Sequence, residues 1–212
     1  MKKLAFDIGA NEGFYTKWML EQKFEKIIAV EPSNRARRKL KKKFKKIGNI
    51  FILDFVISNS TGKISFYDCY PHSSISTAST NYIENSRFAG QYRWKKRVKN
   101  TTTLDNLINE YGEPDLLKID TEGFELNVLK GLKSDKPKLI TFEWHEEDYD
   151  LLLECFLYLE TLGYKKFCEI DRHDDLNLLE NVSWTIDWRD LNLHKDIVPN
   201  RKENLGMVAV TH

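Results

Sequence analysis

Near the start of the sequence, an apolar segment runs directly into a glycine-containing turn, and this feature restricts the fold more than any other. We expect a strand over Leu4–Asp7 and a helix over Tyr15–Gln22. Between them lies the pattern D-x-G-x-x-x-G, from Asp7 through Gly9 to Gly13. Glycine lets a backbone turn tightly and approach a ligand closely at the start of a helix. A strand, such a turn and a helix in this order are typical of nucleotide-binding α/β folds.

The acid in this pattern indicates the kind of ligand. The spacing differs from the G-x-G-x-x-G fingerprint of dinucleotide sites, and a carboxylate at Asp7 attracts an ammonium group and repels a pyrophosphate. S-adenosylmethionine carries an ammonium group, whereas NAD does not. A second predicted strand, Ile27–Glu31, ends in an acid 22 positions after Gly9. An acid at about this distance binds ribose hydroxyls in Rossmann-type sites, so the two motifs together favour S-adenosylmethionine as the cofactor.

Composition restricts the class of protein without indicating a partner. The chain has 212 residues, which fits a single domain over residues 1–212, and its formal net charge of +1 suggests no polyanionic ligand. Three cysteines without a C-x-x-C pair argue against a disulfide framework and against a zinc site. No secretion signal precedes the first strand, and no apolar run approaches the ~20 residues of a membrane span. We therefore expect a cytoplasmic protein.

Predicted strands and helices alternate along the sequence, which indicates a mostly parallel sheet with helices on both faces. The expected strands are Leu4–Asp7, Ile27–Glu31, Ile50–Ile57, Lys63–Tyr67, Leu116–Asp120, Lys138–Trp144, Lys165–Ile170 and Met207–Thr211. The expected helices are Tyr15–Gln22, Arg35–Ile47, Leu104–Tyr111, Glu125–Leu132 and Tyr149–Leu162. Two polar stretches, at about 68–102 and 171–205, break the alternation. We expect long loops there, on the acceptor side of the site.

Acidic residues fall at the ends of four predicted strands: Asp7, Glu31, Asp120 and Glu143. In an open parallel sheet, ligands bind beyond the carboxyl ends of the strands. These four carboxylates are therefore expected to rim one crevice, with Lys118 as a counter-charge. A single acid at such a position more often caps the following helix, but four of them at four strand ends favour an active site.

A series of motifs in order resembles the FkbM-like family of S-adenosylmethionine-dependent methyltransferases. The motifs are DIGANEG, EPS, a Ser-Ser pair after a short hairpin, LLKIDTEGFELNVLKGL and ITFE, which together span roughly residues 4–170. The block KIDTEGFE is the most distinctive of them. The resemblance implies a Rossmann-like class I methyltransferase fold, an α/β fold with a mostly parallel seven-stranded sheet flanked by helices. It also implies methyl transfer to oxygen, commonly to a hydroxyl of a sugar or a natural product.

The same resemblance implies roles for individual residues. The methionine part of the cofactor would lie against Asp7, Gly9, Asn11 and Gly13. The ribose would bind Glu31, and the adenine would lie near Asp54 and Phe55. The methyl group and the acceptor would face Asp120 and Glu122.

Methyl transfer to a sugar hydroxyl requires a group that takes up the hydroxyl proton, because the hydroxyl is a weak nucleophile at neutral pH. Asp120 is the first candidate for this general base. Glu143 and His145 are the second, since they alternate along one strand and so face the same side; a hydrogen-bonded structural role is the alternative for His145. Asp120, Glu122 and Glu143 could instead hold Mg²⁺, which prefers oxygen ligands. Spacing alone does not favour a metal.

Two basic stretches leave other functions open. Residues 35–46 contain nine lysines and arginines on an amphipathic helix, and five more surround Trp94. A solvated surface is the simpler interpretation, and a docking face for nucleic acid or an anionic membrane is the alternative; the nearly balanced net charge argues against nucleic acid. The sequence thus predicts an O-methyltransferase for a sugar, a glycan or a small hydroxylated acceptor. The alternatives are an RNA methyltransferase and a cofactor-binding module without catalysis.

Overall fold

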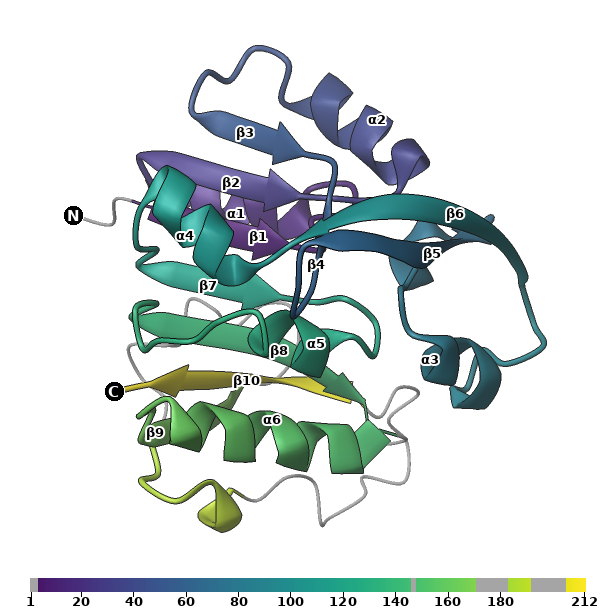
Figure 1. The fold of residues 1–212 in the computed structure, drawn as a ribbon. Helices are drawn as coiled ribbons and strands as arrows, with labels where there is room; N and C mark the ends of the chain where they lie inside the picture. The colour runs from purple at the N-terminus through teal and green to yellow at the C-terminus, as the bar shows by residue number, and fades with distance from the viewer. Residues whose placement is uncertain (1–3, 146–147, 171–182, 192–204) are drawn as a thin grey trace.

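A seven-stranded sheet forms the centre of the molecule (Figure 1). The computed structural model describes residues 4–145, 148–170, 183–191 and 205–212. The strands of this sheet are β1 (Leu4–Ile8), β2 (Lys26–Val30), β3 (Ile50–Leu53), β7 (Leu116–Ile119), β8 (Leu139–His145), β9 (Lys166–Ile170) and β10 (Leu205–Thr211). Each of them overlaps a strand that the apolar runs of the sequence predict.

The strand order is β3-β2-β1-β7-β8-β10-β9. The five strands β3, β2, β1, β7 and β8 run parallel to one another, and β10 is antiparallel to both β8 and β9. The order changes direction between β1 and β7, so Asp7 and Lys118 lie in register although they are far apart in the sequence. Ligands of open α/β sheets bind at such a switch point, which is therefore where a site is expected.

Helices cover both faces of this sheet. The described residues contain helices α1 (Phe14–Glu21), α2 (Asn34–Lys43), α3 (Thr80–Asn85), α4 (Leu104–Tyr111), α5 (Glu125–Leu129) and α6 (Tyr149–Thr161), with 3₁₀ turns η1 (Ser73–Ile75) and η4 (Trp188–Asp190). Of these, α3 lies beside β5 and β6 rather than on the seven-stranded sheet (Figure 1). In Figure 1, α4, α5 and α6 lie in front of the sheet and α1 lies behind it. No helix among the residues that the structure describes is long and apolar enough to cross a membrane.

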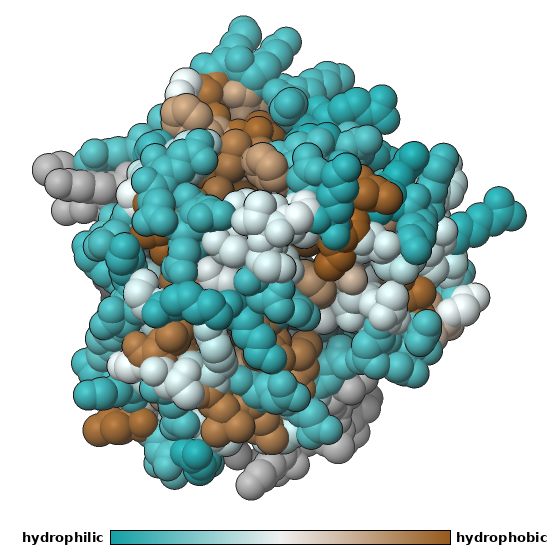
Figure 2. Space-filling view, in the orientation of Figure 1, coloured by the Kyte–Doolittle hydropathy of each residue, from teal (hydrophilic) through white to brown (hydrophobic). Residues whose placement is uncertain are grey.

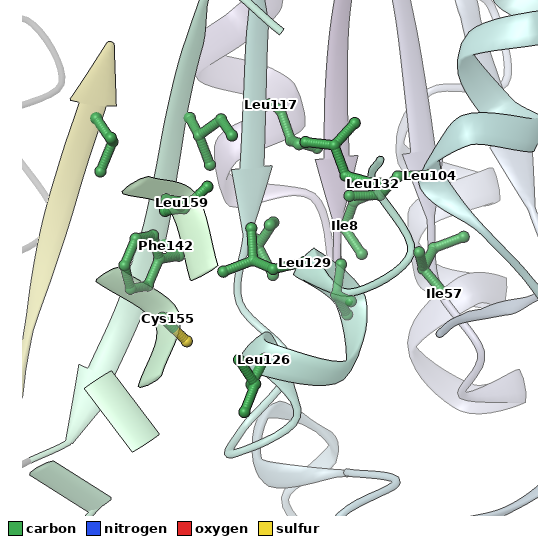
Figure 3. Packing of buried hydrophobic residues seen from close by; sticks show 14 of the residues in the cluster. Ile8, Ile57, Leu104, Leu117, Leu126, Leu129, Leu132, Phe142, Cys155 and Leu159 are labelled. Carbon is green, nitrogen blue, oxygen red and sulfur yellow. The ribbon is translucent and has the colours of Figure 1, made fainter. Parts of the chain in front are cut away.

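Successive side chains of a strand point to opposite faces of the sheet, so neighbouring residues pack in different apolar clusters. Phe6 and Ile8 pack in the largest apolar cluster with α4 and α5, whereas Ala5, which precedes Phe6 and faces the other side of the sheet, packs with Met19 of α1. Figure 3 shows the larger cluster, where Leu117 and Phe142 of the sheet meet helix residues. Burying one such side chain stabilises a fold by ~1.5–3 kcal/mol, so this cluster fixes the strand ends that carry the acidic residues.

A second sheet corrects two of the sequence predictions. It consists of β4 (Val56–Ile57), β6 (Arg93–Thr102) and β5 (Gly62–Tyr70), in that order. The predicted continuous strand Ile50–Ile57 is wrong, because β3 ends at Leu53 and, after two intervening residues, the chain enters the second sheet at Val56. The predicted loop at 68–102 is wrong as well, because β5 extends to Tyr70 and β6 pairs with it along nine residues of each strand. Between them, residues 71–92 contain η1 and α3; we call them the β5–β6 connection.

The other predicted loop, at 171–205, falls mostly outside the described residues. In the part that the structure describes, Trp188 is buried and its ring stacks on Phe156 of α6 with 5.3 Å between ring centroids. Trp188 therefore belongs to the core.

The basic segment forms α2, which ends four residues before the predicted limit of Ile47. Ser33 caps its start by accepting a hydrogen bond from the Ala36 amide. Leu40 and Phe44 are buried against the sheet, and the lysines of its last turn are exposed. Hydrophilic side chains cover this part of the surface in Figure 2. The predicted amphipathic helix is therefore confirmed.

Candidate active site

The glycine turn after β1 brings three strand ends together. Gly9 has a left-handed φ of 77°, and a Cβ atom there would lie 1.7 Å from the backbone oxygen of Asp120. The amides of Gly9 and Ala10 both donate to the Val30 carbonyl, each at 3.0 Å. Glycine tolerates both this φ and this close approach because it lacks Cβ. The turn thereby holds the carboxyl ends of β1, β2 and β7 in contact.

A cavity of about 420 Å³ lies beyond these strand ends. Such a volume falls within the range of about 300–1,000 Å³ that is usual for small-molecule sites. Of the residues predicted from the sequence, its lining includes Gly9, Asn11, Glu31, Phe55, Asp120, Glu122 and Glu143. The lining does not include Asp7, Gly13, Asp54 and His145. The sequence therefore located the cavity but not every residue's place in it.

Gly13 is needed for packing. Its φ is 82°, and a Cβ atom there would lie 2.5 Å from side-chain atoms of both Leu40 and Phe44. The absence of a side chain thus lets α2 pack against the start of α1. Asn11 has a positive φ as well, of 46°, and it reaches the cavity lining.

Glu31, at the end of β2, is 5% exposed and lines the cavity. Its Oε2 accepts a hydrogen bond from the Asn11 amide at 2.7 Å, and its Oε1 accepts one from the Ser33 amide at 2.6 Å. Burial outweighs these two bonds and raises the pKa of Glu31 to about 7. Because each carboxylate oxygen has a further lone pair, both can still accept hydrogen bonds from ligand hydroxyls.

Asp7 lies beside the cavity and is completely buried. Its Oδ2 accepts a hydrogen bond from the Thr16 hydroxyl at 2.6 Å, and its Oδ1 is 3.4 Å from the Lys118 ammonium. The two residues are neighbours on parallel strands, so their side chains leave the sheet on the same side. The predicted direct contact of Asp7 with a ligand ammonium is therefore not what this geometry provides, because the ammonium of Lys118 lies there.

Lys118 connects Asp7 to Asp120. Its Nζ is 3.1 Å from Asp120 Oδ2 and lies 4.6 Å from the centre of the Tyr15 ring. Burial disfavours the ammonium, but the two carboxylates outweigh burial and raise the pKa of Lys118. Burial likewise opposes the ionised form of Asp120, yet Lys118 and a hydrogen bond from the Glu143 carboxyl hold the pKa of Asp120 below its ordinary value. Asp120, whose side chain is 25% exposed, is therefore ionised at neutral pH.

Glu122 is held in place by the β5–β6 connection. It has a φ of 56°, which is uncommon for a residue with a Cβ atom. Tyr82 of α3 donates its hydroxyl proton to Glu122 Oε2, and the Thr77 hydroxyl donates to the Glu122 carbonyl at 2.8 Å. At Gly123, a Cβ atom would lie 3.1 Å from the Tyr82 side chain. This contact fixes the backbone beside Asp120.

Glu143 and His145 share one side of β8, as their alternation predicted. His145 Nε2 lies 3.5 Å from an oxygen of Glu143 and 3.5 Å from an oxygen of Glu122. Burial, together with the charges of Asp120 and Glu122, raises the pKa of Glu143 to about 8. Burial opposes a charged imidazole, but the two glutamates outweigh it and raise the pKa of His145 to about 11. His145 consequently holds a proton at neutral pH, which removes it as a candidate base.

The other end of the cavity is apolar. Phe55, Val56 and Ile57 line it where the chain enters the second sheet, together with Phe66 of β5. The neighbouring Asp54 carboxylate pairs with Arg37 at 2.7 Å and with Lys99 at 2.9 Å. Asp54 thus ties α2 to β6 and does not contact the cavity.

Some lining residues were not expected as site residues. Ser73, Ser74 and Ser76 come from the β5–β6 connection, and Phe14 follows the glycine turn. The Ser-Ser pair served only as part of the family resemblance. Tyr82 carried no sequence signal, because it is one of several aromatic residues in a polar stretch and belongs to no motif.

Solved structures share this fold at low sequence identity. Ribosomal protein L11 methylase from Lactobacillus delbrueckii subsp. bulgaricus matches with a TM-score of 0.51 and 9% identity, over 100% of this chain and 72% of that one. A putative RNA methyltransferase from Pyrococcus horikoshii has a TM-score of 0.49 and 9% identity, over 99% and 74%. Precorrin-6y C5,15-methyltransferase from Geobacter metallireducens GS-15 has a TM-score of 0.46 and 11% identity, over 99% and 79%.

The strand order and the likeness to the L11 methylase confirm the predicted Rossmann-like class I methyltransferase fold. No curated protein matches the sequence. Residues 7–166, however, match the methyltransferase FkbM domain. This stretch includes every residue that lines the cavity. The chain therefore belongs to the methyltransferase FkbM family, and it is a methyltransferase with the fold of the S-adenosylmethionine-binding type.

Proposed function

We propose that this protein transfers a methyl group from S-adenosylmethionine to a hydroxyl of a sugar, a glycan or a small hydroxylated molecule. The observation that carries the proposal is the composition of the cavity. One end combines an apolar wall with Glu31, and the other end combines Asp120, Glu122 and Glu143. A nucleoside and a reacting group fit these two ends in that order.

The residues present fit the parts of the cofactor. Glu31 has lone pairs left for two ribose hydroxyls, and Phe55 and Phe66 offer apolar surface for an adenine ring. Gly9 lets the turn lie directly against the Asp120 backbone, because a Cβ atom there would come within 1.7 Å of the Asp120 carbonyl oxygen. The acidic end attracts a positively charged sulfonium group, as a cleft lined by one sign of charge does. When bound, the cofactor supplies an electrophilic methyl group.

Asp120 is the residue that we assign to take up the proton of the acceptor hydroxyl. It lines the cavity and is ionised at neutral pH, because Lys118 stabilises its charge. The neighbouring Glu143 carboxyl is hydrogen-bonded to it, so a proton on Asp120 is shared within a pair. Positioning the acceptor oxygen against the methyl group supplies the rest of the rate.

The remaining lining favours a neutral acceptor. Ser73, Ser74 and Ser76 offer hydroxyl groups that can hydrogen-bond to a hydroxylated molecule. The cation in the lining, Lys118, is already paired with Asp7 and Asp120. A phosphate group would therefore meet mostly carboxylates, which is why we favour a sugar-like acceptor over RNA.

The test is product detection with isotope-labelled S-adenosylmethionine. The protein is incubated with neutral sugars, glycans, hydroxylated small molecules and RNA, and products are identified by mass spectrometry. We expect a labelled methyl ether on a hydroxylated acceptor and none on RNA. Methylation of RNA alone would overturn the acceptor assignment. If calorimetry detected no binding of S-adenosylhomocysteine, the cofactor assignment would fail; binding without any product would favour a module without catalysis.

A further inference from the structure

Three side chains of different chemistry converge at the acidic end of the cavity. The ligand atoms of Glu122, Glu143 and His145 all lie within 4.8 Å of one another. Among the residues that the structure describes, no other group of three or more histidines, cysteines, aspartates and glutamates converges in this way. Glu122 comes from the turn after β7, and the other two come from the end of β8.

The separations are those of metal ligands. Bonds of about 2.0–2.2 Å from a metal ion to imidazole nitrogen and carboxylate oxygen place neighbouring ligand atoms ~3–3.5 Å apart. His145 Nε2 is 3.5 Å from each glutamate oxygen, which is longer than a well-made hydrogen bond. Within the described part of the chain, neither ring nitrogen of His145 makes a hydrogen bond of good geometry, although the side chain is 97% buried. The imidazole is thus placed beside two carboxylates without being tightly bonded to either.

The charges at this place also favour a cation. Lys118 lies 3.4 Å from Asp7 and 3.1 Å from Asp120, so its charge offsets that pair. Glu122 and Glu143 instead face His145. Bringing two carboxylates together in a buried place costs free energy unless positive charge offsets it. Binding of a divalent ion would release the imidazole proton, because a metal ligand must be deprotonated, and would place two positive charges where the protonated histidine supplies one.

We propose that Glu122, Glu143 and His145 form a binding site for a divalent transition-metal ion. Two carboxylate oxygens and one imidazole nitrogen suit Mn²⁺ or Zn²⁺, whereas Mg²⁺ prefers a shell of oxygen ligands. Glu122 and Glu143 line the cavity and His145 does not, so the ion is held at the cavity boundary. The set differs from the Asp120, Glu122 and Glu143 set that the sequence suggested for Mg²⁺, because Lys118 engages Asp120.

The role of the ion rests on the proposed function. The ion would bind the acceptor hydroxyl and lower its pKa, as metal ions do for bound water. The hydroxyl proton would pass to Asp120 while the oxygen–carbon bond forms and the carbon–sulfur bond of the cofactor breaks. Binding of the ion itself needs neither cofactor nor acceptor, so it can be tested alone.

The experiment measures metal binding directly. Protein freed of metal by chelation is equilibrated with Mn²⁺ or Zn²⁺ by dialysis, and bound metal is counted by mass spectrometry. We expect about one ion per chain, with binding at least about tenfold weaker in Glu143→Gln and in His145→Gln. Glu125→Gln is the matched control, because Glu125 is a buried acid nearby whose carboxylate instead accepts hydrogen bonds from Thr121.

Circular dichroism of each variant checks its fold, and the wild-type measurement stands even if one variant does not fold. Wild-type protein that binds neither ion would overturn the proposal. Equal binding by the wild type and a folded His145→Gln variant would overturn it too. If the wild type binds one ion and both variants lose it, the metal site is supported even when no methylated product is found. The missing product would then count only against the proposed reaction.

Discussion

Each buried acid near the cavity is kept in a different state of charge by its own partners. Asp120 is ionised beside Lys118, whereas Glu31 receives two backbone amides and still has its pKa raised to about 7. An acid whose pKa lies near neutrality changes charge within the working range of an enzyme. Residues of one chemical type therefore contribute differently to binding and to proton transfer.

If Glu31 binds the ribose as proposed, cofactor binding should depend on pH. Ribose hydroxyls would donate to its ionised form, and in the free protein this form is lost as the pH falls through about 7. Since the bound state favours the ionised form, affinity for S-adenosylhomocysteine should fall by up to about tenfold per pH unit below 7 and level off above 8. Calorimetry between pH 5.5 and about 8.5 checks this. In Glu31→Gln the slope should disappear; an unchanged slope would assign the effect to another group.

Asp120→Asn separates a base from a structural acid. The variant keeps the shape and removes the charge, and Lys118 keeps Asp7 as a partner. We expect turnover to fall by ~10²–10⁴, the usual contribution of a general base, while S-adenosylhomocysteine still binds. Helix capping is not its role, because the following helix, α5, has Phe124 at its N-cap position and no side-chain capping hydrogen bond.

The control for Asp120→Asn is Glu12→Gln, which removes a negative charge from the cavity lining at an exposed position paired with Lys39. Similar turnover losses in both variants would indicate a general effect of charge. Near-normal turnover of Asp120→Asn would move the assignment to Glu143.

At the scale of the element, apolar runs were sufficient to predict the main sheet, because its central strands β1, β7 and β8 are buried on both faces. β1, β2, β7 and β8 end where the acids begin, so Glu31, Asp120 and Glu143 could be placed from the sequence. β6 could not, because six of its ten side chains are exposed and half of the ten are charged, and its stability comes from pairing with β5. The break after Leu53 was missed for a related reason, since an apolar run does not show which sheet it joins.

The pairing of Asp7 with Lys118 could not be predicted from the sequence either. Which carboxylate the long Lys118 side chain reaches depends on the register of β1 and β7, and that register is a property of the folded sheet. Tyr82 depends in the same way on how the β5–β6 connection docks against Glu122.

Tyr82→Phe tests whether that docking supports catalysis. Burial and the charge of Glu122 raise the pKa of Tyr82, so its hydroxyl remains a donor. Loss of this hydroxyl, which donates to the buried Glu122 carboxylate, should cost ~1–3 kcal/mol of stability and should also lower turnover. S-adenosylhomocysteine affinity should change little, since Tyr82 does not line the cavity. Melting temperature, turnover and calorimetry provide the measurements.

Tyr158→Phe is the matched control. Tyr158 of α6 donates its hydroxyl proton to the Leu132 carbonyl at 2.7 Å, and it does not line the cavity. We expect this variant to lose stability and keep its turnover per folded molecule. If both variants behaved alike in turnover, the contact between Tyr82 and Glu122 would be structural only.

At the scale of the molecule, charge is distributed unevenly over a chain whose net charge is +1. The exposed face of α2 is strongly basic, whereas the cavity lining is rich in carboxylates. Charges that face solvent are screened within about 8–10 Å at physiological salt. The two regions should therefore act independently unless the acceptor itself is a large anion.

Reversing charge on α2 tests this independence. Lys41, Lys42 and Lys45 are exposed, and changing all three to Glu should leave turnover of a neutral acceptor within a few-fold. With an anionic acceptor, the change should weaken binding and flatten its dependence on salt. The same charge change at the exposed residues Lys63, Lys165 and Lys166 is the control. A large loss on a neutral acceptor in the α2 variant alone would contradict the solvated-surface interpretation.

The two residues that join the main sheet to the second sheet have a consequence for the rate of ligand exchange. Asp54 is fixed to α2 through Arg37 and to β6 through Lys99, and Phe55 beside it forms part of the apolar wall. So short and so well anchored a link leaves that wall little freedom to swing open. Phe14, which follows the glycine turn after β1, also lines the cavity and is 58% exposed. A nucleoside would therefore enter and leave past Phe14, and trimming this ring should speed association and dissociation together while leaving the equilibrium between them nearly unchanged.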